Sequence, residues 1–133
     1  MNFIQKLIIL FAMIFFHLID DYKLQGILAN MKQRKWWIEN ANKSLYKNDY
    51  KIALIEHAFS WSFTTTLPIL YITVIQQNNV LAWLLVISYI INTLLHAYVD
   101  DLKANKFRIN LVEDQLFHLF QIFITWIIMC AAI

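Results

Sequence analysis

Four long apolar runs, separated by two charged segments and one short polar turn, constrain this chain more than any other feature. The runs cover about residues 3–20, 52–75, 80–99 and 116–133. A run of about 18 or more apolar residues is typical of a membrane span, because roughly 20 helical residues cross a hydrocarbon layer about 30 Å thick. Hydrophobic residues make up 60% of the 133 residues, against about 45–50% in soluble domains. The sequence therefore predicts an integral membrane protein built mainly of helix.

The order and spacing of these runs predict an all-α, four-helix up-down bundle in a single membrane domain, residues 1–133. Only the polar residues 76–79 separate the second and third runs, which fits a tight turn. The longer segment between the first and second runs carries Trp36 and Trp37 among lysines, a combination typical of the headgroup region. We expect a short interfacial helix around residues 29–39. The first run lacks a small-residue cleavage site, so we interpret it as a retained span.

The distribution of charge predicts the orientation of the bundle. Of the eleven Lys and Arg residues, all but Lys6 lie in the two charged segments, which share one side of the membrane. By the positive-inside rule we expect these segments to be cytoplasmic and both termini to lie outside. Acids are interleaved with the bases, which argues against a nucleic-acid partner. Because Cys130 is the single cysteine, no intrachain disulfide is possible.

The antiparallel arrangement would bring all the histidines of the chain to one depth. They lie near the cytoplasmic ends of the four predicted spans: His17, His57, His96 and His118. Three of them have an aspartate four residues away, on the same face of a helix: Asp21, Asp100 and Asp114. Glu56 is adjacent to His57 and points about 100° away on a helix, so it is a less secure partner. Stranded charges are costly in a membrane, so these groups are expected to face inward and pair.

Polar residues continue these faces deeper into the bundle. The third span carries Ser88 and Asn92 below its histidine, and the fourth carries Gln121 and Thr125. We expect a polar interior that is open to the cytoplasm. The extra acids Asp20 and Asp101 are expected to face water. Large aromatic residues of the spans are expected to contact lipid: Phe15, Phe16, Trp61, Trp83 and Trp126.

Imidazole and carboxylate ligands together suit Zn, Mn or Fe, and helical bundles build such sites from residue pairs one turn apart. We predict one or two divalent ions held by the four histidines and their aspartates: His17, Asp21, His57, His96, Asp100, Asp114 and His118. Two alternative roles for these residues are also consistent with the sequence. One is a buried hydrogen-bond network that fixes helix packing, and the other is a proton or ion pathway.

Four segments of the chain carry a family resemblance. They are His17-Leu-Ile-Asp-Asp-Tyr-Lys-Leu-Gln25, a lone His57, His96-Ala-Tyr-Val-Asp-Asp-Leu-Lys103 and Asp114-Gln-Leu-Phe-His118. In this order they resemble the domain of unknown function 3307 family, small integral membrane proteins of bacteria and phages. The resemblance implies no known activity. It places Gln25, Lys103 and Gln115 at motif positions and implies a bacterial inner membrane.

The leading functional hypothesis is a metal-dependent hydrolase at the cytoplasmic membrane face, with an amphipathic or phosphorylated substrate. A divalent ion would lower the pKa of a bound water, and a free carboxylate would act as base. The residues expected to take part in catalysis are Asp21, Asp100, Asp114 and Lys103. The alternatives are a metal-ion or proton transporter and a structural or accessory membrane subunit. Because four short spans bury little surface, a homo-oligomer is also consistent with the sequence, which does not fix the oligomeric state.

Overall fold

The computed structural model describes residues 1–42 and 45–133, and it confirms the predicted all-α bundle. Four helices are long and apolar enough to cross a membrane. Helix α1 (Phe3–Ile19) continues into the π-helical turn η1 (Asp20–Leu24), and the other long helices are α4 (Asp49–Gln76), α5 (Asn79–Ala104) and α6 (Leu111–Ala132). Two short helices, α2 (Leu28–Met31) and α3 (Arg34–Asn40), lie between η1 and α4. At the ends that carry the histidines, the helices extend beyond the predicted apolar runs when η1 is counted with α1, so each histidine and its aspartate lie on continuous helix.

Asparagine residues fix where three of the long helices begin. Asn2 and Asn110 each form a capping box, in which the asparagine side chain accepts from the backbone of the third helical residue and that residue's side chain accepts in return. Asn78 accepts from the first turn of α5. Gln77, in the left-handed conformation with φ of 50°, ends α4. The chain therefore reverses between α4 and α5 within two residues, as the polar run at 76–79 predicted.

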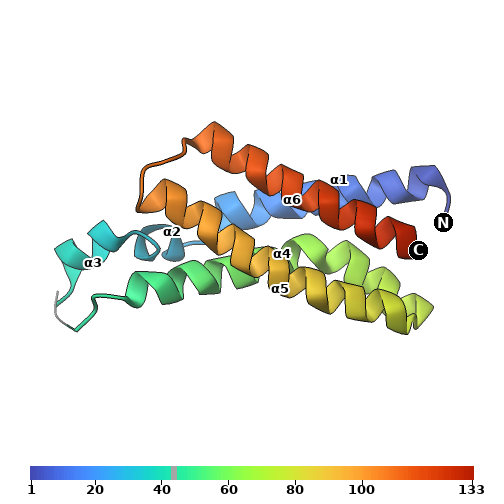
Figure 1. Cartoon of the computed structure of the whole chain (residues 1–133), viewed down its shortest axis with the longest axis horizontal. Coiled ribbons are helices and arrows are strands. Elements are labelled where there is room, and N and C mark those ends of the chain that lie inside the picture. The colour runs from blue at the N-terminus through green and yellow to red at the C-terminus, as the bar shows by residue number, and fades with distance from the viewer. Residues whose placement is uncertain (43–44) are drawn as a thin grey trace.

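The four long helices are antiparallel neighbours and close into a bundle. Helix α4 packs against α1 and α5, and α6 packs against α5 and α1. Figure 1 shows both termini at the end of the bundle that also holds the α4–α5 turn, whereas α2, α3 and the α5–α6 connection lie at the opposite end. We call this opposite end the loop end. It is the end at which all four histidine motifs lie.

A cluster of apolar residues lies in the half of the bundle nearer the termini, beside buried polar side chains such as Ser88 and Thr125. Met13, Trp61, Leu81, Ile122 and Met129 are all at most 1% exposed and form one cluster. Large apolar side chains such as Phe11, Ile90 and Phe120 lie on the outside, as expected for helices that face lipid. The expectation that Trp61 contacts lipid is wrong, because its indole is fully buried, whereas Trp83 does lie on the outside.

The core of the bundle gives the first test. Leu81→Ala should lower the free energy of unfolding by about 2–5 kcal/mol, because it leaves a cavity among fully buried side chains. Leu94→Ala is the matched control on the same helix, since Leu94 is 64% exposed and its loss opens no cavity. Unfolding of the detergent-solubilised protein by circular dichroism measures both. Equal losses of unfolding free energy in the two variants would contradict the assignment of Leu81 to the core and of Leu94 to the outer surface.

Candidate metal centre

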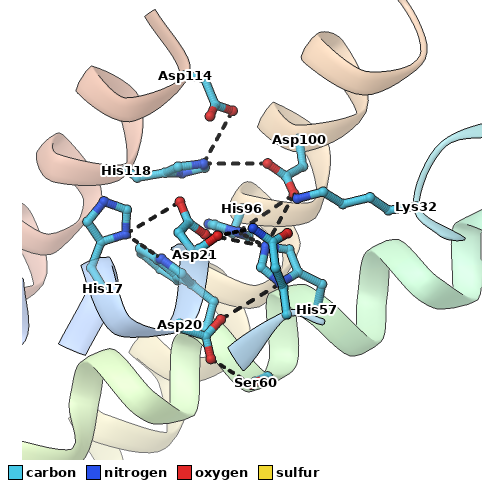
Figure 2. Close-up of polar contacts among 12 residues, drawn as sticks. His17, Asp20, Asp21, Lys32, His57, Ser60, His96, Asp100, Asp114 and His118 are labelled. Atoms are coloured by element: carbon cyan, nitrogen blue, oxygen red, sulfur yellow. Dashed lines mark hydrogen bonds and ion pairs between the residues drawn. The ribbon is translucent and has the colours of Figure 1, made fainter. Parts of the chain in front are cut away.

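The histidine motifs of all four long helices meet in one buried layer at the loop end of the bundle (Figure 2). His57, His96, Asp114 and His118 are fully buried, and Asp100 is 1% exposed. His17 and Asp21 complete the layer from α1 and η1 and are also buried. The prediction that antiparallel spans bring these seven residues to one depth is confirmed. We call this set the His/Asp layer.

One group of ligand atoms surrounds the Nε2 atom of His57. This nitrogen lies 3.1 Å from His96 Nε2, 3.4 Å from Asp21 Oδ1 and 3.4 Å from Asp100 Oδ2. Two ligands of a tetrahedral ion, each bound at about 2.0–2.1 Å, stand roughly 3.3–3.5 Å apart. One ligand atom each from Asp21, His57 and His96 lies within 4.8 Å of the others. These side chains could therefore hold one metal ion.

A second group surrounds the Nε2 atom of His118. It lies 3.3 Å from Asp114 Oδ1 and 3.6 Å from Asp100 Oδ1, and it has no hydrogen-bond partner. Ligand atoms of His96, Asp100 and His118 also lie within 4.8 Å of one another. Asp100 contributes its Oδ2 to the first group and its Oδ1 to the second. The layer could therefore hold two ions bridged by this carboxylate.

The tautomer of His17 follows from its two hydrogen-bond partners. Its Nδ1 accepts a hydrogen bond of 2.7 Å from Trp61 Nε1, which can only donate. Its Nε2 therefore carries the proton and donates to Gln115 Oε1 at 3.1 Å. The Gln115 amide is oriented in turn by donation to Asp21 Oδ2 at 2.9 Å. Both ring nitrogens of His17 are thus engaged, and the histidine supports Asp21 through Gln115.

Asp20 lies inside the bundle, and the expectation that it faces water is wrong. Its Oδ1 accepts from Ser60 at 2.7 Å and from Thr64 at 3.2 Å, and its Oδ2 lies 3.7 Å from His57 Nδ1. The π-helical turn that begins at Asp20 is wider than an α-helical turn, and such turns are frequent at functional sites. It allows two adjacent acids to point inward. A histidine that binds a metal through one ring nitrogen usually has a carboxylate next to its other nitrogen, and Asp20 takes this position beside His57 Nδ1.

Two lysine ammonium groups contact the layer at its loop end. Lys32, at the end of α2, is 6% exposed and donates to Asp100 Oδ2 at 2.5 Å. Lys103 makes an ion pair with Asp114 and lies 3.8 Å from Asp100 Oδ1. Lys32 is held in place by Asn105, whose amide donates to the Lys32 carbonyl oxygen at 3.0 Å. The expectation of an open polar interior is wrong, because these side chains and α2 cover the layer.

The remaining residues singled out from the sequence lie around the layer. Gln25 donates to the Asp21 backbone oxygen, and Asn92 donates to Thr125 Oγ1 at 2.8 Å. Glu56 is exposed, as its position on the helix predicted. Asp101 is partly exposed and pairs with Lys106 at 2.7 Å, outside the layer.

Lys32, Asp20 and Trp61 are the residues that sequence reasoning missed. Lys32 is one of several lysines in a charged loop, and no periodicity distinguishes it. The adjacent acids Asp20 and Asp21 are visible in the sequence, but only the π-helical turn allows both carboxylates to point into the bundle. Trp61 lies four residues after His57, on the same face of α4, and this spacing could have placed it beside the histidines.

Comparison with known proteins finds no match for this chain, whether among family models, curated proteins or solved structures. The function of the protein must therefore be inferred from the geometry of the His/Asp layer.

The contact between Trp61 and His17 gives the second test. Trp61→Phe keeps most of the aromatic packing but leaves the His17 Nδ1 acceptor buried without its donor. The free energy of unfolding should fall by about 1–3 kcal/mol. Trp83→Phe is the control, because Trp83 is 69% exposed on the outside of the bundle. A Trp61→Phe protein as stable as the wild type would argue against the assigned tautomer.

Proposed function

We propose that the His/Asp layer is a divalent metal centre and that the protein uses it for hydrolysis at a membrane face. The distances between ligand atoms are the observation that carries this proposal. Around His57 Nε2 they measure 3.1–3.4 Å, close to the edge of a tetrahedron of ligands about one ion. Zn, Mn and Fe accept mixed imidazole and carboxylate ligands of this kind.

A network of direct hydrogen bonds accounts less well for the same residues. The contacts between histidine nitrogens and aspartate oxygens in the described residues measure 3.3–3.9 Å. Ordinary N–H···O hydrogen bonds measure about 2.7–3.2 Å. Buried nitrogens such as His57 Nδ1 and His118 Nε2 are also without a hydrogen-bond partner. Histidine and aspartate atoms that are spaced too widely for ordinary hydrogen bonds, yet lie within 4.8 Å of one another in two groups, favour a shared cation.

The charge of the layer supports the same proposal. Four buried carboxylates, from Asp20, Asp21, Asp100 and Asp114, face only two lysines, so two negative charges remain if the imidazoles are neutral. Stranded charge inside a membrane costs on the order of 2.5–3.5 kcal/mol at the centre of a span and less near its ends. One divalent ion would balance the two remaining charges. A water molecule on that ion could then supply hydroxide near neutral pH.

Hydrolysis is favoured over transport by the apolar cluster nearer the termini, although a polar chain leads from His118 through Gln121 and Asn92 to Thr125. An ion that left the layer towards the termini would meet the fully buried side chains of Trp61, Leu81, Ile122 and Met129. A carboxylate of the layer that does not bind the ion would offer a base for the attacking water. The lipid bilayer around the four spans suits an amphipathic substrate that reaches the loop end from the membrane.

The orientation and the family remain part of the proposal. The basic residues of the loop end favour a cytoplasmic location for it, with both termini outside. The motif resemblance to the domain of unknown function 3307 family favours a bacterial inner membrane. It also agrees with the positions of Lys103 and Gln115, which both contact Asp114.

Metal content is the direct test of this proposal. Purified wild-type protein should retain about one equivalent or more of Zn, Mn or Fe in elemental analysis. His96→Ala should reduce this to below about a tenth of an equivalent, because ligand atoms of His96 belong to both groups. Glu56→Gln is the matched control, since Glu56 is exposed beside the ligand His57 and should leave the content unchanged. Wild-type protein without metal, or a His96→Ala protein with the same content, would refute the centre.

Flux measurements separate hydrolysis from transport. Proteoliposomes that contain the wild-type protein should show no uptake of Mn²⁺ or protons above that of empty liposomes, because fully buried apolar side chains such as Trp61, Leu81 and Met129 lie on the side of the layer that faces the termini. Uptake that Asp100→Asn abolishes would instead establish a transporter.

A further inference from the structure

The two lysines of the layer contact opposite oxygens of one carboxylate. Lys32 Nζ lies 2.5 Å from Asp100 Oδ2, and Lys103 Nζ lies 3.8 Å from Asp100 Oδ1. Because both oxygens belong to one small anionic group, both ammonium groups can reach a single anion placed at the loop end of the layer. Figure 2 shows the Lys32 side chain entering from the side and ending at Asp100.

The lysines would lose their present partners when metal ions bind. Both groups of ligand atoms use Asp100, and the group around His118 uses Asp114, which is the other partner of Lys103. An ion on these oxygens removes the negative charge that now holds the two ammonium groups. Because an unpaired buried cation such as Lys32 is costly, a centre with an ion in each group favours a new anion at this place.

The charge of the loaded layer indicates the charge of that anion. With one ion the charges of the layer cancel. With an ion in each group, two positive charges remain after four carboxylates and two lysines are counted, and a phosphate dianion balances them. Lysine is a common phosphate ligand in proteins, and pairs of divalent ions stabilise the attacking and leaving oxygens in phosphoryl transfer. A carboxylate substrate would supply only one negative charge.

We infer that the centre hydrolyses a phosphate monoester and that Lys32 and Lys103 bind its phosphate group. This inference rests on the metal centre proposed above. In the reaction, the oxygen of a hydroxide formed from water bonds to phosphorus. The bond from phosphorus to the ester oxygen breaks and its electron pair stays on that oxygen. The proton taken from water by a carboxylate passes to the leaving oxygen, so the products are an alcohol and inorganic phosphate.

The segment that carries Lys32 can give access to the layer. Helix α2 is only four residues long and lies between Gly26, with φ of 48°, and the extended residue Gln33. The side chain of Lys103 is already 27% exposed. The phosphate group could therefore approach beside Lys103, and the Lys32 side chain would turn from Asp100 towards it while Asn105 holds the Lys32 backbone.

Binding of inorganic phosphate to the Mn²⁺-loaded, detergent-solubilised full chain tests the inference. Equilibrium binding of radiolabelled phosphate should weaken about tenfold or more in Lys32→Met and in Lys103→Met, because each loses a charge-assisted hydrogen bond. Metal content should be unchanged in both variants. Lys106→Met is the matched control, since Lys106 pairs with Asp101 outside the layer, and its phosphate affinity should stay within about twofold. Lys32→Arg and Lys103→Arg should restore much of the affinity if a Met variant folds poorly.

Metal-loaded wild-type protein that binds no phosphate would overturn the inference and leave the metal centre standing. Phosphate affinity unchanged in both Met variants would also overturn it. Wild-type protein without metal would refute the proposed function, and this inference with it.

An assay of phosphate release from two substrates would identify whether the phosphate group comes from a lipid or from a soluble compound. Nanodiscs of phosphatidic acid supply a lipid phosphate, and p-nitrophenyl phosphate supplies a soluble monoester. Release from phosphatidic acid alone assigns a membrane lipid as substrate, and release from p-nitrophenyl phosphate assigns a soluble one. Release from neither substrate by the metal-loaded protein would contradict hydrolysis of phosphate monoesters.

Discussion

Carboxylates buried among membrane-spanning helices must be neutralised, and the loop end of this bundle is arranged around that requirement. Asp100 is at the centre of it, because its two oxygens face His57, His118 and both lysines of the layer. With neutral imidazoles, the two lysines offset only part of the negative charge. The remaining charge, together with imidazole nitrogens that have no hydrogen-bond partner, makes the layer suited to bind cations.

Trp61 links this polar layer to the apolar half of the bundle. Its indole stacks on His96 with ring centroids 4.2 Å apart, and its Nε1 fixes the tautomer of His17. One side chain thus closes the layer on the side of the termini and orients a histidine within it. On the other side, Asn105 fixes Lys32 over Asp100. The layer is enclosed from both directions, which keeps the dielectric low and strengthens interactions between its charges.

The layout of the bundle and the depth of the histidines could be predicted from the sequence. Apolar runs of span length, a polar turn at residues 76–79 and an aspartate one turn from three of the histidines are local patterns with a fixed geometric meaning. They placed His17, His57, His96 and His118 in one layer correctly. These local patterns could not predict which role each individual histidine has in the layer. His17 has both ring nitrogens in hydrogen bonds, whereas the Nε2 atoms of His57 and His96 face each other.

The sequence by itself determined that the chain forms four helices long and apolar enough to span a membrane, with histidines and aspartates at one end. Hydrophobic length and helical period carry this information, because each depends only on neighbouring residues. Only the tertiary structure decided which acids point inward, that Lys32 reaches Asp100 from 68 residues away, and that Asp100 is shared between two groups of ligands. These features depend on a π-helical turn and on contacts between distant helices. Such contacts follow from how the helices pack, which no local pattern of residues encodes.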